Sequence, residues 1–226
     1  MTIRTARNRK KGKDSDSSEK DKKKEHLIQT AIGLFARKGF ADTPIRAIAK
    51  AAKVNTALLY YYFKDKEELL NQIIMGATGR LVAILKEIQQ TEPDPLECLK
   101  KMIGRQISFA SESRKETKVL VMDADRLHGR SKTECLRLQR EIYDVYMNQL
   151  IRLKEANVIG DINLTVANFA IFSMTNWFYR WYKQGGALNE DEISGQMIKI
   201  LLHGFLNSDF PGTSKIRKTK AEQSRA

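Results

Sequence analysis

The spacing of apolar residues between His26 and Leu70 predicts three helices separated by two sharp turns. Apolar side chains recur at helical intervals up to Lys38 and stop at Gly39, where a left-handed turn costs least because glycine has no side chain. The residues that share the inward face of this first helix are Ile28, Ala31, Ile32, Leu34 and Phe35.

Two further helix starts follow within sixteen residues. Thr43 offers a hydroxyl that can cap a helix, and Pro44 suits the first helical position because its missing N–H has no partner there. Asn55 is expected to cap a third helix after a link of only three residues, 52–54. A link of that length joins two helices at a steep angle in a helix-turn-helix, whose second helix lies in the major groove of DNA.

The outward face of this third helix is therefore expected to contact DNA. Leu58, Leu59 and Phe63 form the expected inward set, and the three tyrosines between them cannot all face a core. Their hydroxyls suit phosphate oxygens; alternatively, one tyrosine packs and two lie idle at the surface. Asp65 is expected to cap the next helix, which makes its first turn a phosphate anchor. The expected DNA contacts are Thr43, Arg46, Asn55, Thr56, Ala57, Tyr60, Tyr61, Tyr62 and Lys66.

Three motifs in this region carry a family resemblance. They are AIGLFARKGF at 31–40, IAKAAKV at 48–54 and LYYYFKDKEELL at 59–70. Together they resemble the DNA-binding domain of the TetR family of bacterial one-component transcriptional repressors, which implies a homodimer that binds an operator.

This sequence departs from the family pattern at two places. The family usually has glycine where Lys53 stands, and a lysine in a turn that requires positive φ is strained. It often has lysine and glycine where Thr56 and Ala57 stand. Without a long donor at position 56, base reading is expected to depend on Asn55, van der Waals contacts and tyrosine hydroxyls.

The net charge of +13 is concentrated at the DNA-binding end and in two tails. Residues 1–24, 25–66 and 211–226 carry +6, +4 and +4, whereas residues 67–210 carry −1. This distribution is expected if only one end meets a polyanion. Residues 1–24 have too few apolar side chains to fold alone, so we expect a disordered basic arm that lies along DNA or serves only as a solubilising leader. Residues 211–226 are expected to form a disordered basic tail.

The rest of the chain reads as helical, with few breakers and no strand-like alternation. Pro93-Asp94-Pro95 is expected to end one helix and cap the next. The predicted fold is all-α, with a helix-turn-helix head at residues 25–70 and an effector-binding and dimerisation body at 71–210. About nine helices are expected, and those after the head lie near 66–90, 95–110, 115–125, 132–156, 164–184 and 190–206.

The predicted helix at 164–184 is unusually aromatic, which indicates burial on more than one side. One side is expected to pack within the body and another to meet a second copy of the chain; alternatively, all of its aromatic residues are monomer core. The family resemblance implies dimerisation through the last two helices, and pairing would allow a palindrome to be read. Its aromatic residues are Phe169, Phe172, Trp177, Phe178, Tyr179, Trp181 and Tyr182.

The string MTNWFYRWYKQGG at 174–186 is similar to TetR-family regulators of fatty-acid and related acyl-CoA degradation. That resemblance implies an acyl-CoA effector, with its acyl chain in an apolar cavity and its phosphates held by basic residues. Methionine and aromatic residues at helical spacing are also ordinary core residues. The expected wall residues are Met102, Phe109, Met122, Phe172, Asn176 and Trp177, and the basic candidate is Arg180.

Enzyme chemistry is not expected. Cys98 and Cys135 lie far apart and are expected to be buried as small apolar residues, and the three histidines lack the spacing of metal ligands. No nucleophile elbow, phosphate loop or dinucleotide fingerprint is present, so no cofactor is expected. Asp123 and Asp125 point in different directions on a helix, and Arg126 can neutralise one of them. The chain shows no signal peptide and no apolar run of about 18 residues, which predicts a cytoplasmic protein without a membrane partner.

These observations predict a homodimeric repressor that binds a palindromic operator and is released by a small effector, most simply an acyl-CoA thioester. The effector would favour a dimer whose reading heads are wrongly spaced for DNA. Two alternatives remain open: a TetR-type repressor that senses hydrophobic or cationic drug-like molecules, and a ligand-free architectural protein that coats DNA with its basic tails.

Overall fold

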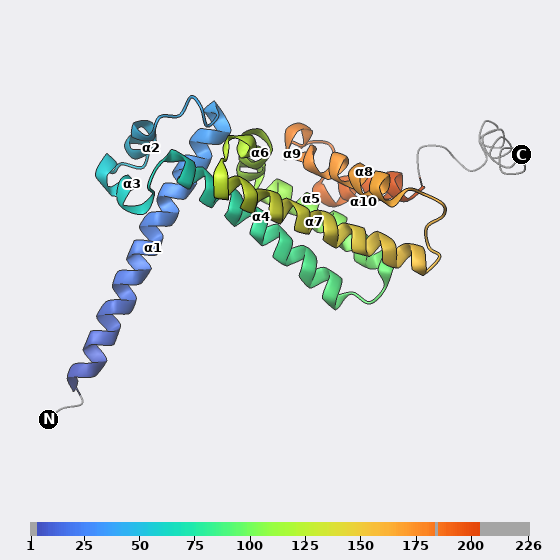
Figure 1. Ribbon diagram of the computed structural model, residues 1–226, viewed down its shortest axis with the longest axis horizontal. Coiled ribbons are helices and arrows are strands. Elements are labelled where there is room, and N and C mark those ends of the chain that lie inside the picture. The colour runs from blue at the N-terminus through green and yellow to red at the C-terminus, as the bar shows by residue number, and fades with distance from the viewer. Residues whose placement is uncertain (1–3, 184, 204–226) are drawn as a thin grey trace, which may run out of the picture. The chain divides into compact units, whose positions relative to one another are not determined.

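The computed structural model describes residues 4–183 and 185–203, with side chains from residue 18 onward. All regular structure within these ranges is helical, which confirms the all-α prediction (Figure 1). The helices form two compact units. The first holds residues 4–87 and 112–145, and the second holds residues 88–111, 146–183 and 185–203.

The first unit begins with α1 (Arg4–Lys38), α2 (Ile45–Ala51) and α3 (Thr56–Tyr62), followed by α4 (Lys66–Thr91). Gly39 has φ 85°, and its N–H donates to the carbonyl oxygen of Phe35 at 2.8 Å, as predicted for a left-handed helix end. In Figure 1, α2 and α3 lie beside the C-terminal part of α1. The three helices and two turns of the predicted helix-turn-helix are therefore present.

The first helix is longer than predicted, because residues 4–24, expected to be a disordered arm, are helical. A helix already nucleated at 25–38 extends at low cost, since each added residue gains one backbone hydrogen bond. Charge pairs one turn apart add to this, as where Lys23 Nζ lies 2.8 Å from Glu19 Oε1. Residues 1–3 and the tail predicted at 211–226 lie outside the described residues.

The core of the first unit extends beyond the head predicted at residues 25–70. It is completed by α6 (Arg114–Asp123), the 3-10 helix η1 (Ala124–Arg126) and the first part of α7 (Gly129–Glu155). Val119, Leu127 and Cys135 are buried in one apolar cluster with head residues such as Phe35 and Leu59. The reading head therefore shares its core with α6.

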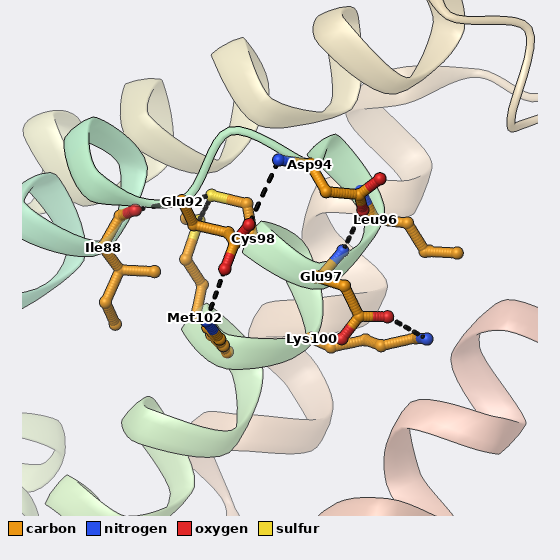
Figure 2. Close-up of polar contacts among 9 residues, drawn as sticks. Ile88, Glu92, Asp94, Leu96, Glu97, Cys98, Lys100 and Met102 are labelled. Carbon is orange, nitrogen blue, oxygen red and sulfur yellow. Dashed lines mark hydrogen bonds and ion pairs between the residues drawn. The ribbon is translucent and has the colours of Figure 1, made fainter.

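The second unit contains most of α5 (Pro95–Glu112), the end of α7, α8 (Leu164–Asn176), α9 (Phe178–Trp181) and α10 (Glu190–His203). Its first turn follows the prediction, because Asp94 Oδ1 accepts from the N–H groups of Leu96 at 2.9 Å and Glu97 at 2.7 Å (Figure 2). The nine predicted helices are present, and the eighth is divided at Trp177 into α8 and α9. Position 184 and the predicted end of the last helix at 204–206 lie outside the described residues.

Both cysteines are free and buried, as predicted. Burial raises the pKa of each thiol. Cys98 Sγ lies 3.9 Å from both the carbonyl oxygen of Ile88 and Met102 Sδ (Figure 2). These contacts are those of small packing residues, and they agree with the structural role expected for the cysteines.

One helix among the described residues, α4, has the length and composition of a membrane-spanning helix. Half of its apolar 18-residue window is buried inside the protein. Leu69, Leu70, Ile73 and Ile74 from this helix belong to the core of the first unit. Such burial is typical of a core helix, so composition alone is weak evidence for a membrane span.

Candidate nucleic-acid interface and effector site

The third helix is positioned by its cap and by two buried residues. Asn55 Oδ1 accepts from the N–H of Leu58 at 2.7 Å, which confirms Asn55 as the N-cap of α3. Leu59 and Phe63 are buried as predicted, whereas Leu58 is only partly buried. The opposite face of α3 is thereby left at the surface.

The three tyrosines divide between surface and core. Tyr60 and Tyr61 are 52% and 68% exposed, while Tyr62 is half-buried and meets the Tyr61 ring edge-on at 5.0 Å. Two phenol hydroxyls are thus accessible on the face predicted to meet DNA. The packing fits both sequence interpretations, which differ in whether those hydroxyls bind phosphate.

The turn before α3 is strained as predicted, because Lys53 has φ 57°. Its N–H donates to the Lys50 carbonyl oxygen at 3.2 Å. A contact that the sequence reasoning missed also fixes this turn, since His26 Nε2 on α1 donates to the carbonyl oxygen of Ala52 at 3.2 Å. The angle between α2 and α3 is therefore set partly from α1.

The prediction that Thr43 caps α2 was wrong. Its hydroxyl donates to the carbonyl oxygen of Gly39 at 2.7 Å, and α2 begins at Ile45 after Pro44 without a side-chain cap. The end of α1 leaves carbonyl groups without helical partners, and one of them takes the hydroxyl. Thr43 is also fully buried, so its side chain offers nothing to a phosphate in this conformation.

Three other predicted contacts lie on or near the surface of the head. Arg46 is exposed on α2, Ala57 is exposed on α3, and Thr56 is half-buried at the start of α3. With Asn55, Tyr60 and Tyr61 they leave a reading face that is mostly polar and aromatic. The single cation among these residues is Arg46.

The start of α4 is capped as predicted. Asp65 Oδ1 accepts from the N–H of Glu68 at 2.8 Å, and Glu68 Oε2 accepts from the N–H of Lys64 at 2.6 Å. Lys66 is tied to the turn after α1, because its Nζ donates to the carbonyl oxygens of Phe40 at 2.8 Å and Ala41 at 3.4 Å. Two of its three N–H groups therefore already have acceptors.

The same turn is held from α6 by Asp123, which the sequence reasoning had dismissed. Asp123 is buried, and the backbone of Phe40 donates a hydrogen bond to its carboxylate. Burial raises the pKa of Asp123, while that hydrogen bond and the charges of Arg126, Lys66 and Lys118 oppose the rise. Phe40 is thus held at both ends of its backbone, by Lys66 and by Asp123.

The neighbouring Asp125 behaves differently. It is exposed and pairs with Lys132 Nζ at 2.6 Å, and this hydrogen bond lowers the pKa of Asp125. Arg126 was the partner expected from the sequence. The described residues contain no cluster of histidine, cysteine or carboxylate side chains suited to a metal ion.

The seven predicted effector residues do not form one site. Met102 and Phe109 are buried and Phe172 is half-buried, all in the second unit. Asn176, Trp177 and Arg180 are exposed, with the Arg180 guanidinium 5.8 Å from the Trp177 ring centroid. Met122 is 56% exposed and belongs to the first unit. Helical spacing could not separate core from surface here, because the interrupted helix changes the face that each residue presents.

The second unit contains an apolar cavity of about 320 Å³. It is bordered by α5, the end of α7, the segment before α8, α8 itself and α10. None of the seven predicted residues lines it. The lining residues are Leu99, Ile103, Leu150, Val158, Ile159, Gly160, Asp161, Ile162, Ala167, Ala170, Ile171, Leu201 and Leu202.

Two buried polar residues that the sequence reasoning missed lie in the same unit. Gln106 is 3% exposed, and its Nε2 donates to Thr175 Oγ1 at 2.8 Å and to Asn176 Oδ1 at 3.3 Å. Tyr146 is fully buried with its ring edge-on to Phe172 at 5.5 Å, and burial raises its pKa. Gln106 Oε1 and the Tyr146 hydroxyl have no hydrogen-bond partner among the described residues.

The aromatic segment has two faces, as predicted. Phe178, Tyr179 and Tyr182 are buried, whereas Phe169, Trp177 and Trp181 remain exposed by half or more. The two tryptophans border an apolar surface groove of about 390 Å³. The groove is formed by α8, α9 and α10 and is lined by Ser173, Met174, Trp177, Trp181, Leu188, Ile193, Gln196, Met197 and Ile200.

Known proteins resemble this chain over both of its parts. Residues 27–73 match the family described as bacterial regulatory proteins, tetR family, and residues 92–205 match the tetracyclin repressor-like C-terminal domain. The HTH-type transcriptional repressor KstR2 of Rhodococcus jostii is 27% identical over 192 residues, which cover 84% of this chain and 94% of that protein.

Solved structures show the same fold. The ketosteroid transcriptional regulator KstR2 of Mycobacterium tuberculosis superposes with a TM-score of 0.76 at 22% identity, covering 82% of this chain and 95% of that one. AibR, in complex with isovaleryl coenzyme A and operator DNA, superposes with a TM-score of 0.74 at 23% identity, covering 81% and 100%. With a helix-turn-helix head and a helical C-terminal part that both match the family, this chain belongs to the TetR family of bacterial transcriptional repressors, which are regulators rather than enzymes.

Proposed function

We propose that the protein is a cytoplasmic homodimer that represses transcription at a palindromic operator and is released by a small effector. The observation that supports operator reading most directly is the exposed face of α3, with Tyr60 and Tyr61 at the surface and the cap residue Asn55 at its start. Arg46 on α2 and the remaining N–H of Lys66 would contact phosphates, which fix register without reading sequence. Asn55 and the tyrosine hydroxyls would contact bases.

Homodimerisation is supported by the exposed aromatic face of α8 and α9. Phe169, Trp177 and Trp181 lie exposed beside the apolar groove, and α10 supplies the buried residues Ile193 and Met197 to its lining. A second copy that packs the same face would bury these rings, and two-fold pairing presents two reading helices to a palindrome.

An acyl-CoA thioester is the proposed effector. The cavity of the second unit offers an apolar volume within the range of small-molecule sites, and Arg180 lies exposed where a phosphate could reach it. The structure of AibR holds isovaleryl coenzyme A together with operator DNA. The fold that this chain shares can thus carry both ligands.

A second candidate effector is favoured by one residue of the cavity. Asp161 is the single charged residue in its lining, and a carboxylate there suits an uncharged or cationic molecule better than an anionic one. A hydrophobic or cationic drug-like effector is therefore the alternative within the same repressor function.

The effector would act by population shift. Because α6 shares the core of the first unit and Asp123 holds the turn after α1, a displacement of α6 would move the reading head. The effector then weakens DNA binding only by its differential affinity for the displaced state.

The test combines operator selection with ligand screening. The purified chain is used to select fragments of genomic DNA, and the selected fragments are expected to share a palindrome. Thermal unfolding is then followed with acyl-CoAs, free CoA, fatty acids and cationic drugs, since a ligand at 100 times its Kd adds about 2.7 kcal/mol of stability. Stabilisation and DNA release by acyl-CoAs alone would support the proposal, whereas the same response to cations would establish the second candidate. DNA binding without sequence preference and without any thermal shift would reject both and indicate an architectural protein.

A further inference from the structure

Two buried oxygens in the second unit have no hydrogen-bond partner among the described residues. They are Oε1 of Gln106 on α5 and the hydroxyl of Tyr146 on α7. Buried polar atoms in folded proteins almost always have partners, so two exceptions in one unit call for an explanation. A bound molecule that completes both groups would supply it.

The orientation of the Gln106 amide follows from its neighbour. Thr175 Oγ1 donates its single proton to the carbonyl oxygen of Ile171 at 2.9 Å. It can therefore only accept from Gln106, which places the amide nitrogen toward Thr175 and leaves Oε1 as the atom without a partner. That oxygen accepts hydrogen bonds and cannot donate one.

Both groups lie on the helix faces that border the apolar cavity. Residues three or four positions apart share one face of a helix. On α5, Gln106 follows the lining residue Ile103 by three positions, and on α7, Tyr146 precedes the lining residue Leu150 by four. On α8, Thr175 follows the lining residue Ile171 by four.

The three helices carry their polar groups on the same side of the cavity. Gln149 Nε2 on α7 donates to the carbonyl oxygen of Pro95 at 2.6 Å, so the end of α7 lies beside the start of α5. Tyr146 precedes Gln149 in α7, and Gln106 follows Pro95 in α5. A displacement from the cavity toward Tyr146 thus runs in the direction of Gln106, which places both polar groups beyond the cavity's inner end.

The chemistry of this end selects an uncharged ligand. The lining contains no cation to balance a carboxylate, and Asp161 would repel one. Gln106 Oε1 requires a donor, and the Tyr146 hydroxyl, whose pKa is raised by burial, stays protonated and can donate. A ligand hydroxyl satisfies both needs, because it donates one hydrogen bond and accepts others.

We propose that the cavity binds an apolar, uncharged moiety bearing a hydroxyl, which donates to Gln106 Oε1 and accepts from the hydroxyl of Tyr146. The inference rests on the proposed effector function and narrows it to hydroxylated ligands.

The experiment measures ligand affinity by calorimetric titration of the full chain. The probes are decanoyl-CoA, its analogues hydroxylated at successive chain positions, the analogue ending in a carboxylate, and free decanediols. Tyr146→Phe removes only the hydroxyl, and Gln106→Met removes the acceptor at similar volume. Tyr143→Phe is the matched control, because it removes the same atom from a tyrosine on α7 that lies beneath the Arg140 guanidinium.

At least one hydroxylated probe is expected to bind about tenfold more tightly than decanoyl-CoA, as expected for buried hydrogen bonds gained. Tyr146→Phe and Gln106→Met are each expected to abolish that preference while decanoyl-CoA binds as before, and Tyr143→Phe is expected to retain it. Tyr146→Phe is also expected to unfold at no lower temperature than the wild type, because the hydroxyl it removes has no protein partner.

Two results would overturn the inference: equal affinity for plain and hydroxylated probes, or a preference that survives both variants. If decanoyl-CoA nevertheless binds and releases DNA, the proposed function stands alone. If only the free decanediols bind, and bind through Tyr146, the hydroxyl site stands and the acyl-CoA effector is wrong. Binding by no probe at all would reject both.

Discussion

The ammonium of Lys66 and the backbone of Phe40 join the start of α4 to the turn after α1. Lys66 Nζ lies 2.8 Å from the Phe40 carbonyl oxygen and 4.2 Å from the centroid of its ring. One cation thus makes a hydrogen bond and a cation-π contact with the same residue. Because both elements belong to the reading head, this contact sets where the head's first turn lies.

The first prediction concerns Lys66→Ala. Loss of the hydrogen bond and the ring contact is expected to destabilise the first unit by about 1–3 kcal/mol. If the remaining N–H binds a phosphate, the variant is also expected to weaken all duplexes and to reduce the salt dependence of binding by about one ion. Thermal unfolding and DNA titration at several salt concentrations measure the two effects separately.

Lys64→Ala is a suitable control, because Lys64 is exposed and its side chain makes no contact with this turn in the described structure. A Lys66 variant that loses stability but keeps the wild-type salt slope would limit Lys66 to the structural role.

The second prediction is a pH dependence at Asp123. Burial raises the pKa of Asp123 above its ordinary value of 3.8, so the folded state holds this proton more tightly than the unfolded chain does. The group therefore lowers stability as the pH rises from about 3.8 through its raised pKa. Asp123→Asn keeps an oxygen acceptor for Phe40 but cannot ionise, so it is expected to melt at a higher temperature than the wild type at pH 7.

The same linkage requires this difference to shrink as the pH is lowered toward 4, because the wild-type carboxyl then becomes neutral as well. Melting temperatures of both proteins between pH 4 and 8 provide the measurement. A less stable Asn variant at neutral pH would show that the charges of Arg126, Lys66 and Lys118 outweigh the burial.

The third prediction concerns the strained turn at Lys53. Glycine reaches φ 57° without a steric penalty, so Lys53→Gly is expected to gain up to about 1 kcal/mol after allowance for the extra freedom of the unfolded chain. Lys53→Ala keeps the strain and removes only the exposed side chain, which makes it the matched control. Chemical unfolding curves would contradict the argument if alanine and glycine stabilised the protein equally.

The features that the sequence predicted correctly are local. The caps at Asn55, Asp65 and Asp94 and the turn at Gly39 each join atoms within four positions of one another, so residue type and spacing suffice to recognise them. Thr43 was the local failure, because its hydroxyl had a choice between capping α2 and bonding the end of α1.

The features that the sequence missed depend on contacts between distant segments. Lys66 and Phe40 are 26 positions apart, and Gln106 and Thr175 are 69 apart. No periodic pattern reports such pairs, and a glutamine within an apolar stripe is indistinguishable from one at its solvent edge. The effector residues were misplaced for the same reason, since burial in the second unit depends on how α5, α7 and α8 pack.

The fourth prediction tests the proposed dimer. Phe169→Glu places a charge on the exposed aromatic face of α8, and its desolvation in an interface is expected to convert a dimer into a monomer. Operator affinity is then expected to fall by roughly 100-fold, because two linked half-sites bind far more tightly than one. Leu136→Glu, on an exposed apolar residue of the first unit, is the control. Sedimentation velocity that still shows a dimer for Phe169→Glu would place the interface elsewhere.

The fifth prediction separates the two roles of Asn55, which caps α3 and is proposed to read a base. Asn55→Ala removes both functions and is expected to cost about 1 kcal/mol of stability. Serine caps a helix about as well as asparagine but has no amide, so Asn55→Ser is expected to melt within a few degrees of the wild type.

The serine variant is nevertheless expected to lose about 1–3 kcal/mol of discrimination at one operator position, because the paired donor and acceptor of an amide are what distinguish a base edge. Competition between the operator and its single-base variants provides the measurement, with Thr56→Ser as a control at the neighbouring position. If Asn55→Ser keeps the full preference of the wild type, Asn55 serves α3 only as its cap, and the bases are read by the tyrosine face alone.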